Sequence, residues 1–350
     1  MRGAESVTEP GTATQAAAPT AGFTALPDLA SRRLGGSVVF ANDELFAEKE
    51  NLIKPAVPVF ATGEFGNKGK VYDGWETRRR REPGSDHAIV RLGCAGIVHG
   101  VVVDTAYFRG NYPPQISVEA LCADGYPSPA ELTGLTWHSL VERTDAVGDC
   151  ANRYPVASPD RWTHVRLSIY PDGGVARLRV HGEVVPDPAF LTGTIDLAAM
   201  ENGGLVADCS DAFYSAPANL ISPGRAADMS DGWENARRRG PGNDYVSFQL
   251  AARGRPGYIE IDTSCFVGNA PGRVALMAAD LADGDWWQVL PRTRVQPDTR
   301  HRFPVDSSRS ATYVRLDVYP DGGLSRLRVY GTVEPEALEL ARRRWLETTP

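Results

Sequence analysis

The chain contains one long pattern twice. Asp73-Gly74-Trp75-Glu76 recurs 158 positions later as Asp231-Gly232-Trp233-Glu234. The same offset connects VVVDTAYFRGN at 101–111 with the matching IEIDTSCFVGN, and it falls to 149 between RLSIYPDGGVARLRV at 166–180 and RLDVYPDGGLSRLRV at 315–329. A repeated unit of about 160 residues is too long for a solenoid repeat. The duplication therefore predicts two domains of the same fold, with a shorter loop in the second.

Within each copy the apolar residues alternate with polar ones. HVRLSIY, VARLRVHGEV, YVRLDVY and LSRLRVYGTV all show this period of two, and PDGG separates the members of each pair. Alternation indicates strands with one buried face, and a Gly-rich tetrapeptide between two strands predicts a turn. Many short strands with hardly any helical periodicity favour an all-β protein. We expect two tandem antiparallel β-sandwich domains of the jelly-roll type.

Composition suggests how the 350 residues are divided. Residues 1–30 are rich in Ala, Thr, Gly and Pro and contain no continuous apolar stretch, which predicts a disordered leader rather than a signal peptide. We assign the first repeat to 31–190, the second to 203–332, and a short C-terminal tail of helical composition to 333–350.

Charge and cysteine content narrow the class of protein. The net charge is −7, which argues against nucleic acid or an anionic membrane as a partner. The five cysteines are odd in number and far apart, as is typical of reduced thiols in a cytoplasmic protein. Since no apolar run approaches the ~20 residues that span a bilayer, we expect a soluble protein.

The stretch DGWETRRRR at 73–81 is the first candidate site. Two carboxylates three residues apart lie beside four guanidinium groups, which can bind a small ligand rich in carboxylate or carbonyl oxygens. A structural network of arginines and carboxylates around a core tryptophan explains the same residues equally well. Alternation along an extended segment would send two arginines inward and two outward.

The second motif is V-D-T-x-x-F-x-G-N, with Asp104 and Asn111 in the first copy. An Asp that ends an apolar strand, followed by a Gly-Asn turn, can present ligand-binding groups at the rim of a sandwich. It can equally form an Asx turn that holds the loop. The six histidines have no metal-binding spacing. There is also no nucleophile elbow, Walker loop or dinucleotide fingerprint.

Taken together, DGWETRRRR, PGSD, VVVDTAYFRGNYP, YPDGGVARLRVHGEV and the preceding FANDELFAEKENLI resemble the allantoicases (allantoate amidinohydrolases) over roughly residues 29–332. The resemblance implies two jelly-roll domains similar to galactose-binding modules. It also implies a hydrolase of non-peptide C–N bonds in linear amidines, which converts allantoate to ureidoglycolate and urea during purine breakdown. A homo-oligomer is implied as well, and the cofactor is left open between none and a divalent metal.

Hydrolysis of allantoate needs groups that transfer protons and groups that bind the substrate, and we assign these roles to polar residues of the motifs. The expected catalytic residues are Glu76, Asp73 and His87, and the expected substrate-binding residues are Arg78, Arg79, Arg80, Asp86, Asp104 and Asn111. Their second-copy counterparts are Asp231, Glu234, Arg237, Asp262 and Asn269. The family usually has Gly-His-Asp-Trp after the arginine run, whereas this chain has GSDH at 84–87 and GNDY at 242–245. We expect the first copy to be closer to a working site.

Two alternatives remain open at this stage. A tandem module that binds carbohydrate or another small ligand could use the same fold, with Trp286-Trp287 as a stacking surface, since fold alone does not give function. The altered histidine positions also allow a relative of the allantoicases that has kept the fold and lost catalysis.

Overall fold

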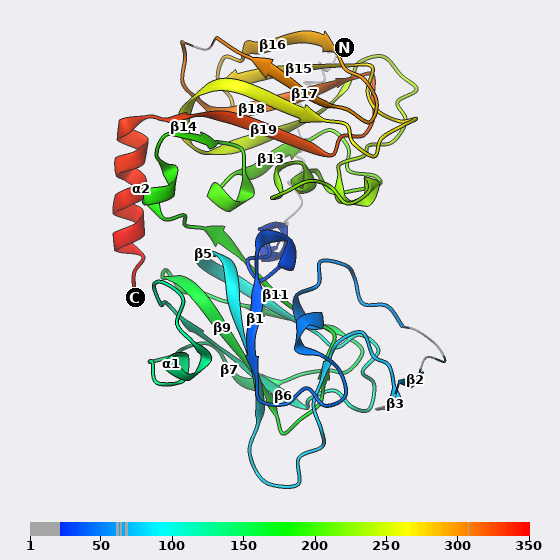
Figure 1. Cartoon of the computed structure of the whole chain (residues 1–350), viewed down its shortest axis with the longest axis vertical. Helices are drawn as coiled ribbons and strands as arrows, with labels where there is room; N and C mark the ends of the chain where they lie inside the picture. Colours follow the sequence, from blue (N-terminus) through cyan, green and yellow to red (C-terminus); the bar gives the residue numbers. More distant parts are fainter. Residues whose placement is uncertain (1–21, 61–62, 64, 67–68, 307) are drawn as a thin grey trace, which may run out of the picture.

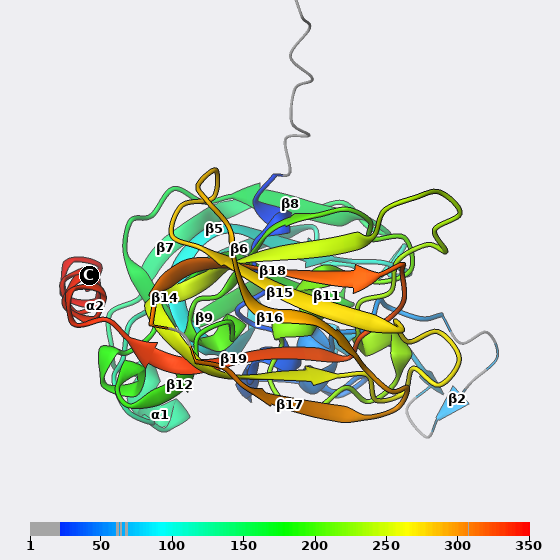
Figure 2. The same ribbon diagram turned by 90° about the horizontal axis from the view of Figure 1, so that it is seen from above.

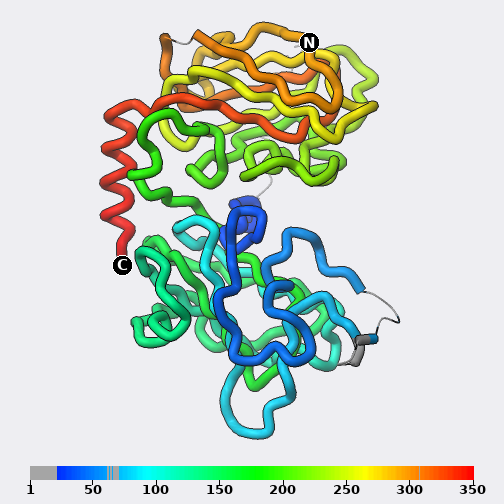
Figure 3. Tube along the Cα trace, viewed as in Figure 1, coloured from blue at the N-terminus to red at the C-terminus, as the bar shows by residue number. Residues whose placement is uncertain are grey.

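The computed structural model describes residues 22–60, 63, 65–66, 69–306 and 308–350. Two antiparallel β units follow one another along the long axis, and the chain trace passes from the first to the second near residue 190 (Figures 1 and 3). Each unit has its own large hydrophobic core. The predicted all-β fold with two tandem sandwich domains is confirmed.

The first unit is a seven-stranded sheet in the order β1-β5-β9-β6-β7, with β11 and β8 also paired to β5. Its strands are β1 (Ser37–Ala41), β5 (Asp86–Asp104), β6 (Gln115–Leu121), β7 (His138–Asp145), β8 (Ala151–Pro155), β9 (Arg161–Tyr170) and β11 (Arg177–Val184). Two short pairs lie outside this sheet: β2 (Phe65–Gly66) with β3 (Gly69–Lys70), and β4 (Trp75–Glu76) with β10 (Gly174–Val175).

The second unit repeats this arrangement as an eight-stranded sheet in the order β12-β19-β14-β18-β15-β16, with β13 and β17 also paired to β14. Its strands are β12 (Thr194–Asp196), β13 (Leu205–Cys209), β14 (Asp244–Asp262), β15 (Arg273–Ala279), β16 (Trp287–Arg294), β17 (Arg300–Pro304), β18 (Ala311–Tyr319) and β19 (Arg326–Val333).

One 19-residue strand organises each unit. The first part of β5 pairs with β1 and β9, its register with β9 shifts between Arg91 and Gly96, and the last part pairs with β11 and β8. Strand β14 does the same with β13 and β18 and then with β17 and β19. Buried residues from both parts of each strand enter one core. A bent strand shared by two layers accounts for the sandwich.

Helices are few and short. Helix α1 (Pro129–Thr133) begins with a capping box formed by Ser128 and Glu131. The single-turn 3-10 helices are η1 (Phe23–Ala25), η2 (Arg32–Leu34), η3 (Lys49–Ile53), η4 (Pro188–Leu191), η5 (Met200–Asn202), η6 (Pro217–Ile221) and η7 (Met229–Asp231). No helix in the described ranges is long and apolar enough to cross a membrane.

Helix α2 (Pro335–Glu347) leaves the second unit and returns along one side of the molecule to the first (Figures 1 and 2). The Arg161 guanidinium of β9 lies 3.5 Å from the centre of the Trp345 ring. The Arg161 backbone N–H donates to the Thr348 carbonyl at 2.7 Å. The C-terminal helix therefore ties the two units together by a cation–π contact and a backbone hydrogen bond.

Two segments that composition placed outside the repeats are part of the folded units. Residues 22–30, which composition placed in the leader, include η1 and the fully buried Leu29, whose N–H bonds the Val180 carbonyl. The rest of the expected leader, 1–21, lies outside the described residues. Strand β12 pairs with β19, so the second unit extends to positions before 203. Apolar side chains in both segments fill the cores, which composition alone does not indicate.

Candidate functional site

A glutamate and an asparagine meet at the loop end of the first unit. Strand β4 pairs with β10 and places Glu76 opposite Gly174, and the Asn111 Nδ2 atom donates to Glu76 Oε1 at 2.7 Å. Both side chains are partly open to solvent. Burial raises the pKa of the Glu76 carboxyl above its ordinary value, and the Asn111 hydrogen bond offsets part of that rise. Within the described residues, no basic side chain bonds Glu76.

The neighbours of Glu76 in the motif hold it in place. The fully buried Trp75 donates its indole N–H to the Asp43 carbonyl at 2.8 Å. The Thr77 hydroxyl accepts the Gly173 N–H at 3.3 Å. A Cβ on Gly74 would lie 2.7 Å from the Phe108 ring and 2.7 Å from the Val175 carbonyl oxygen. The motif therefore needs glycine for close packing against β10, and tryptophan and threonine as anchors.

Asp73 has a different environment from Glu76. Its Oδ2 atom accepts Arg177 Nη2 at 2.6 Å, and the Arg177 side chain is only 1% exposed. Burial alone would raise the pKa of Asp73, but the hydrogen bonds from Arg177 and the Val59 N–H outweigh it and hold that pKa below its ordinary value. Asp73 is therefore the counter-ion of a buried arginine.

The four arginines differ in their partners. Arg78 pairs with Asp43 at 2.5 Å, and Arg80 pairs with Asp86 at 2.7 Å. Arg79 and Arg81 are exposed, and neither makes a hydrogen bond or an ion pair with any described residue. Arg79 is therefore the one expected ligand-binding arginine whose guanidinium is free of a protein carboxylate in the described part of the chain.

Three other expected site residues make their contacts elsewhere and not with Glu76. Asp86 is buried and accepts both Arg80 and the Asn42 side chain. Asp104 accepts the N–H of Ala106, which is the Asx turn left open by the sequence. The adjacent strand residue His87 points to the opposite face from Asp86, and its ring centre lies 5.5 Å from that of Phe40. Burial, and then the Arg166 charge, lowers the pKa of His87.

The second unit contains the same pair. Asn269 Nδ2 donates to Glu234 Oε1 at 2.6 Å, and both residues are partly exposed. Asp231 accepts Arg326 at 3.1 Å, as Asp73 accepts Arg177, and Asp262 accepts the Ser264 N–H. Arg237, the counterpart of Arg79, is likewise exposed and unpaired among the described residues.

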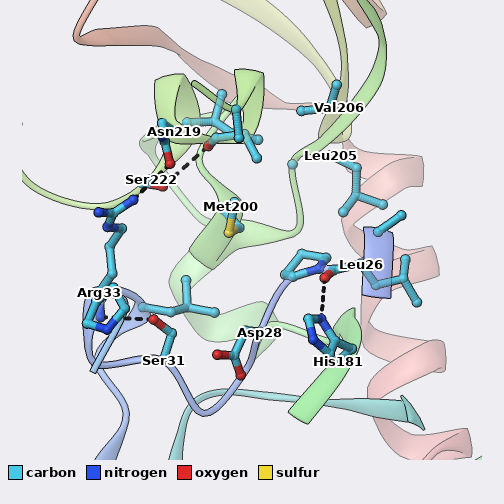
Figure 4. Close-up of a pocket in the computed structure, with 18 of the residues that line it drawn as sticks. Leu26, Asp28, Ser31, Arg33, His181, Met200, Leu205, Val206, Asn219 and Ser222 are labelled. Atoms are coloured by element: carbon cyan, nitrogen blue, oxygen red, sulfur yellow. Dashed lines mark hydrogen bonds between the residues drawn. The ribbon is translucent and has the colours of Figure 1, made fainter. Parts of the chain in front are cut away.

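A cavity of about 760 Å³ lies between the two units and is shown in Figure 4. Its charged groups already have partners: Asp28 pairs with Arg179 at 3.3 Å, and Arg33 donates to Asn219 at 2.8 Å. The His181 Nδ1 atom lies 2.9 Å from the Leu26 carbonyl. None of the residues expected at the site lines this cavity. The candidate site therefore lies at the loops of each unit and not between the units.

No group of three or more His, Cys, Asp or Glu side chains able to hold a metal ion occurs among the residues that the structure describes. All five cysteines are unpaired thiols.

The family model of the allantoicase repeat matches residues 27–185 and 195–334. The chain belongs to the allantoicase family. A probable allantoicase of Nocardia farcinica is 57% identical over 314 residues, which cover 89% of this chain and 95% of that protein. The allantoicase of Dictyostelium discoideum is 42% identical over 317 residues, which cover 86% of each protein. Among solved structures, allantoicase from Saccharomyces cerevisiae matches with a TM-score of 0.74 and 35% identity, and the match covers 87% of this chain and 92% of that one. The resemblance inferred from the motifs is confirmed.

Sequence reasoning about this allantoicase missed the residues that orient the motif. Asp43 binds both the backbone N–H and the side chain of Arg78, Asp172 accepts the Arg80 N–H at 2.8 Å, and Arg177 fixes Asp73. The duplicated YPDGG and RLRV segments contain Asp172 and Arg177, so the repeat itself was a usable signal. These partners were not identified because they lie 35 to 104 residues from the side chains they hold.

Proposed function

We propose that this chain hydrolyses allantoate to ureidoglycolate and urea, and that the reaction takes place beside Glu76 and Asn111. The observation that supports this site is that Glu76 has no arginine partner, unlike the other carboxylates of this segment. Asp73 and Asp86 each pair with an arginine, whereas Glu76 has only the Asn111 amide among the described residues. A half-buried carboxylate without a counter-ion, whose pKa is raised by burial, suits proton transfer.

The proposed reaction uses one carboxyl group in two steps. The Glu76 carboxylate accepts a proton from water as the water oxygen bonds to the central carbon of allantoate. In the same step, as the C–O bond forms, the bond from that carbon to one ureido nitrogen breaks, and its electron pair leaves with the nitrogen. Glu76 then returns the proton to that nitrogen, so urea departs neutral and the carboxylate is restored. General acid–base catalysis of this kind contributes about 10² to 10⁴ in rate.

Substrate binding is assigned to two groups near the motif. Asn111 donates to Glu76 through its amide nitrogen, and its amide oxygen makes no hydrogen bond with the described residues, so it can accept a ureido N–H. Arg79 is exposed and unpaired in the same part of the chain, and its planar fork matches a carboxylate. We therefore assign the substrate carboxylate to Arg79.

The carbohydrate-binding alternative has less support from the tryptophans. Trp287 packs against the second core, and the Arg309 guanidinium lies 3.8 Å from its ring centre. Arg315 lies 5.8 Å from the ring centre of Trp286. Both rings thus already have a cation beside them, whereas a sugar-stacking surface needs an open face.

We also propose that the protein forms a homo-oligomer and works in the cytoplasm. The family resemblance supports the oligomer, and five unpaired thiols support a reducing compartment. Light scattering on the purified chain tests the first proposal, because a monomeric mass at micromolar concentration would contradict it.

The experiment that tests the function is direct. Purified chain is incubated with allantoate, with and without added divalent cation, and urea and ureidoglycolate are measured. We expect one urea per ureidoglycolate in at least one condition. Absence of both products in every condition would refute the enzymatic function and favour a family member that has lost catalysis.

A further inference from the structure

We infer that the second repeat contains a second, independent ureide-hydrolysing site, formed by Glu234 and Asn269, so that each chain has two active centres. This inference rests on the proposed function of the first site. It differs from the sequence-based expectation, which placed the working site in the first copy.

The first support is that the same contacts build the two pairs. The hydrogen bond from asparagine to glutamate is 2.7 Å in the first repeat and 2.6 Å in the second. The tryptophan before each glutamate donates its indole N–H at 2.8 Å to the carbonyl of an aspartate, Asp43 or Asp211. These are the contacts that set the position of the carboxylate, so the second glutamate is held as the first is.

The glycine before each tryptophan is fixed in the same way as well. The Asn51 side chain donates to the Gly74 carbonyl at 2.9 Å, and the Asn219 side chain donates to the Gly232 carbonyl at 2.8 Å. A Cβ on Gly232 would lie 2.5 Å from the Leu324 carbonyl oxygen, so this repeat too requires glycine at that position. The whole segment therefore packs in one way in both repeats.

The second support is that the two sequence differences in the motif leave these contacts intact. Asn235 replaces Thr77, and its side-chain oxygen accepts the Gly322 N–H at 2.9 Å, as the Thr77 hydroxyl accepts that of Gly173. Ala236 replaces Arg78, and its N–H donates to the Asp211 carboxylate at 3.0 Å. Only one guanidinium is lost, and in the first repeat that group pairs with a protein carboxylate.

The third support is an exposed aromatic residue that flanks each glutamate. The Tyr214 N–H donates to the Glu234 carbonyl, and the Phe46 N–H donates to the Glu76 carbonyl, both at 3.1 Å. Tyr214 is 65% exposed and Phe46 is 43% exposed. A planar ureido group can pack on such a ring, while the carboxylate bonds its N–H groups. The second repeat thus offers the same combination of groups to the same class of ligand.

The test compares Glu76→Gln, Glu234→Gln and the double variant, with Asp283→Asn as an exposed control change in the second repeat. Urea release at saturating allantoate is measured per chain, and circular dichroism checks the fold. We expect each single variant to keep part of the wild-type kcat, the two residual values to add up to the wild-type value, and the double variant to fall by about 10² or more. Calorimetry with N-carbamoylglycine, which has one ureido arm and one carboxylate, should give two equivalents bound per wild-type chain, and a single equivalent would overturn the inference.

Each other outcome has a definite meaning. If Glu76→Gln abolishes turnover and Glu234→Gln leaves it complete, the inference is overturned and the proposed function of the first site stands. If either single change removes nearly all turnover while the other also lowers it strongly, the sites are not independent and the inference is again overturned. If the double variant keeps full activity, neither glutamate is catalytic, so the inference and the assignment of the first site to Glu76 are both refuted while hydrolysis of allantoate stands.

Discussion

Two matched substitutions, Asp73→Asn and Glu76→Gln, should have opposite effects. Both replace a carboxylate by its amide with little change in shape, and the two residues lie three positions apart in one motif. The structure makes Asp73 the partner of a buried arginine and Glu76 the partner of a neutral amide. We expect the first change to lower stability and the second to lower activity.

The cost of Asp73→Asn follows from the surroundings of Arg177. Its guanidinium is 1% exposed, and it donates to Asp73 Oδ2 as well as to the carbonyls of Asp73, Ala56 and Ala176. Removing one partner of a buried ion pair costs about 3 to 5 kcal/mol, and a hydrogen bond to a charged group contributes about 1.5 to 3 kcal/mol. Because asparagine still offers an oxygen acceptor and the Asp73 side chain is 21% exposed, we expect a loss of about 2 kcal/mol.

For Glu76→Gln the sign of the stability change differs. Burial raises the pKa of Glu76, so ionisation at neutral pH works against the folded state, and the neutral amide removes that penalty. Gln also keeps an oxygen that can accept the Asn111 hydrogen bond. We expect stability at pH 7 to be unchanged or higher, and kcat to fall by about 10² to 10⁴, or to the rate of the second repeat if that repeat is active.

Urea denaturation followed by tryptophan fluorescence gives the stability change, and urea release from allantoate gives kcat for the folded protein. The reasoning is refuted if Asp73→Asn keeps its stability and loses activity, or if Glu76→Gln unfolds and its folded fraction remains active. Either result would exchange the structural and catalytic roles of the two carboxylates.

Three further predictions concern other residues. Replacing Asn111 by Leu removes the bond that favours ionised Glu76, so the acidic limb of the kcat/KM profile should move to higher pH; an unchanged limb would show that it does not report Glu76. Arg79→Ala should raise KM about tenfold or more, while a change at Arg81, which is also exposed, should not when it is replaced by Ala; equal effects would indicate general charge attraction. Burial, with a smaller effect of a nearby arginine, lowers the pKa of His164 to about 4, so the fold should lose up to about 3 kcal/mol as the pH falls from 6.5 to 4, and His164→Asn should flatten this dependence in urea titrations; a flat wild-type curve would contradict it.

Much of the architecture was determined by local pattern in the sequence. The alternating apolar residues of HVRLSIY form one fully buried face of β9, because successive side chains of a strand point to opposite sides. The other face was expected to be open to solvent, but His164 and Ser168 on it are buried as well. The 158-residue offset placed the same motif in two units, and Trp75 and Trp233 occupy the same buried position in each. The conclusions that depend on chain order and periodicity required no knowledge of distant contacts.

The roles within the motif were decided only by the tertiary structure. Asp73 and Glu76 look alike in the sequence, and they differ because Arg177, 104 residues away, reaches one of them while Asn111 reaches the other. Likewise, the sequence suggests that replacing Thr by Asn235 weakens the second motif. In the structure, the Asn235 side chain accepts a backbone N–H from the turn just as the Thr77 hydroxyl does. The charge and pKa of a side chain depend on its burial and on its partners, and here those partners come from other strands and loops. Local sequence therefore identified the segment, and the fold determined which of its carboxylates has no counter-ion.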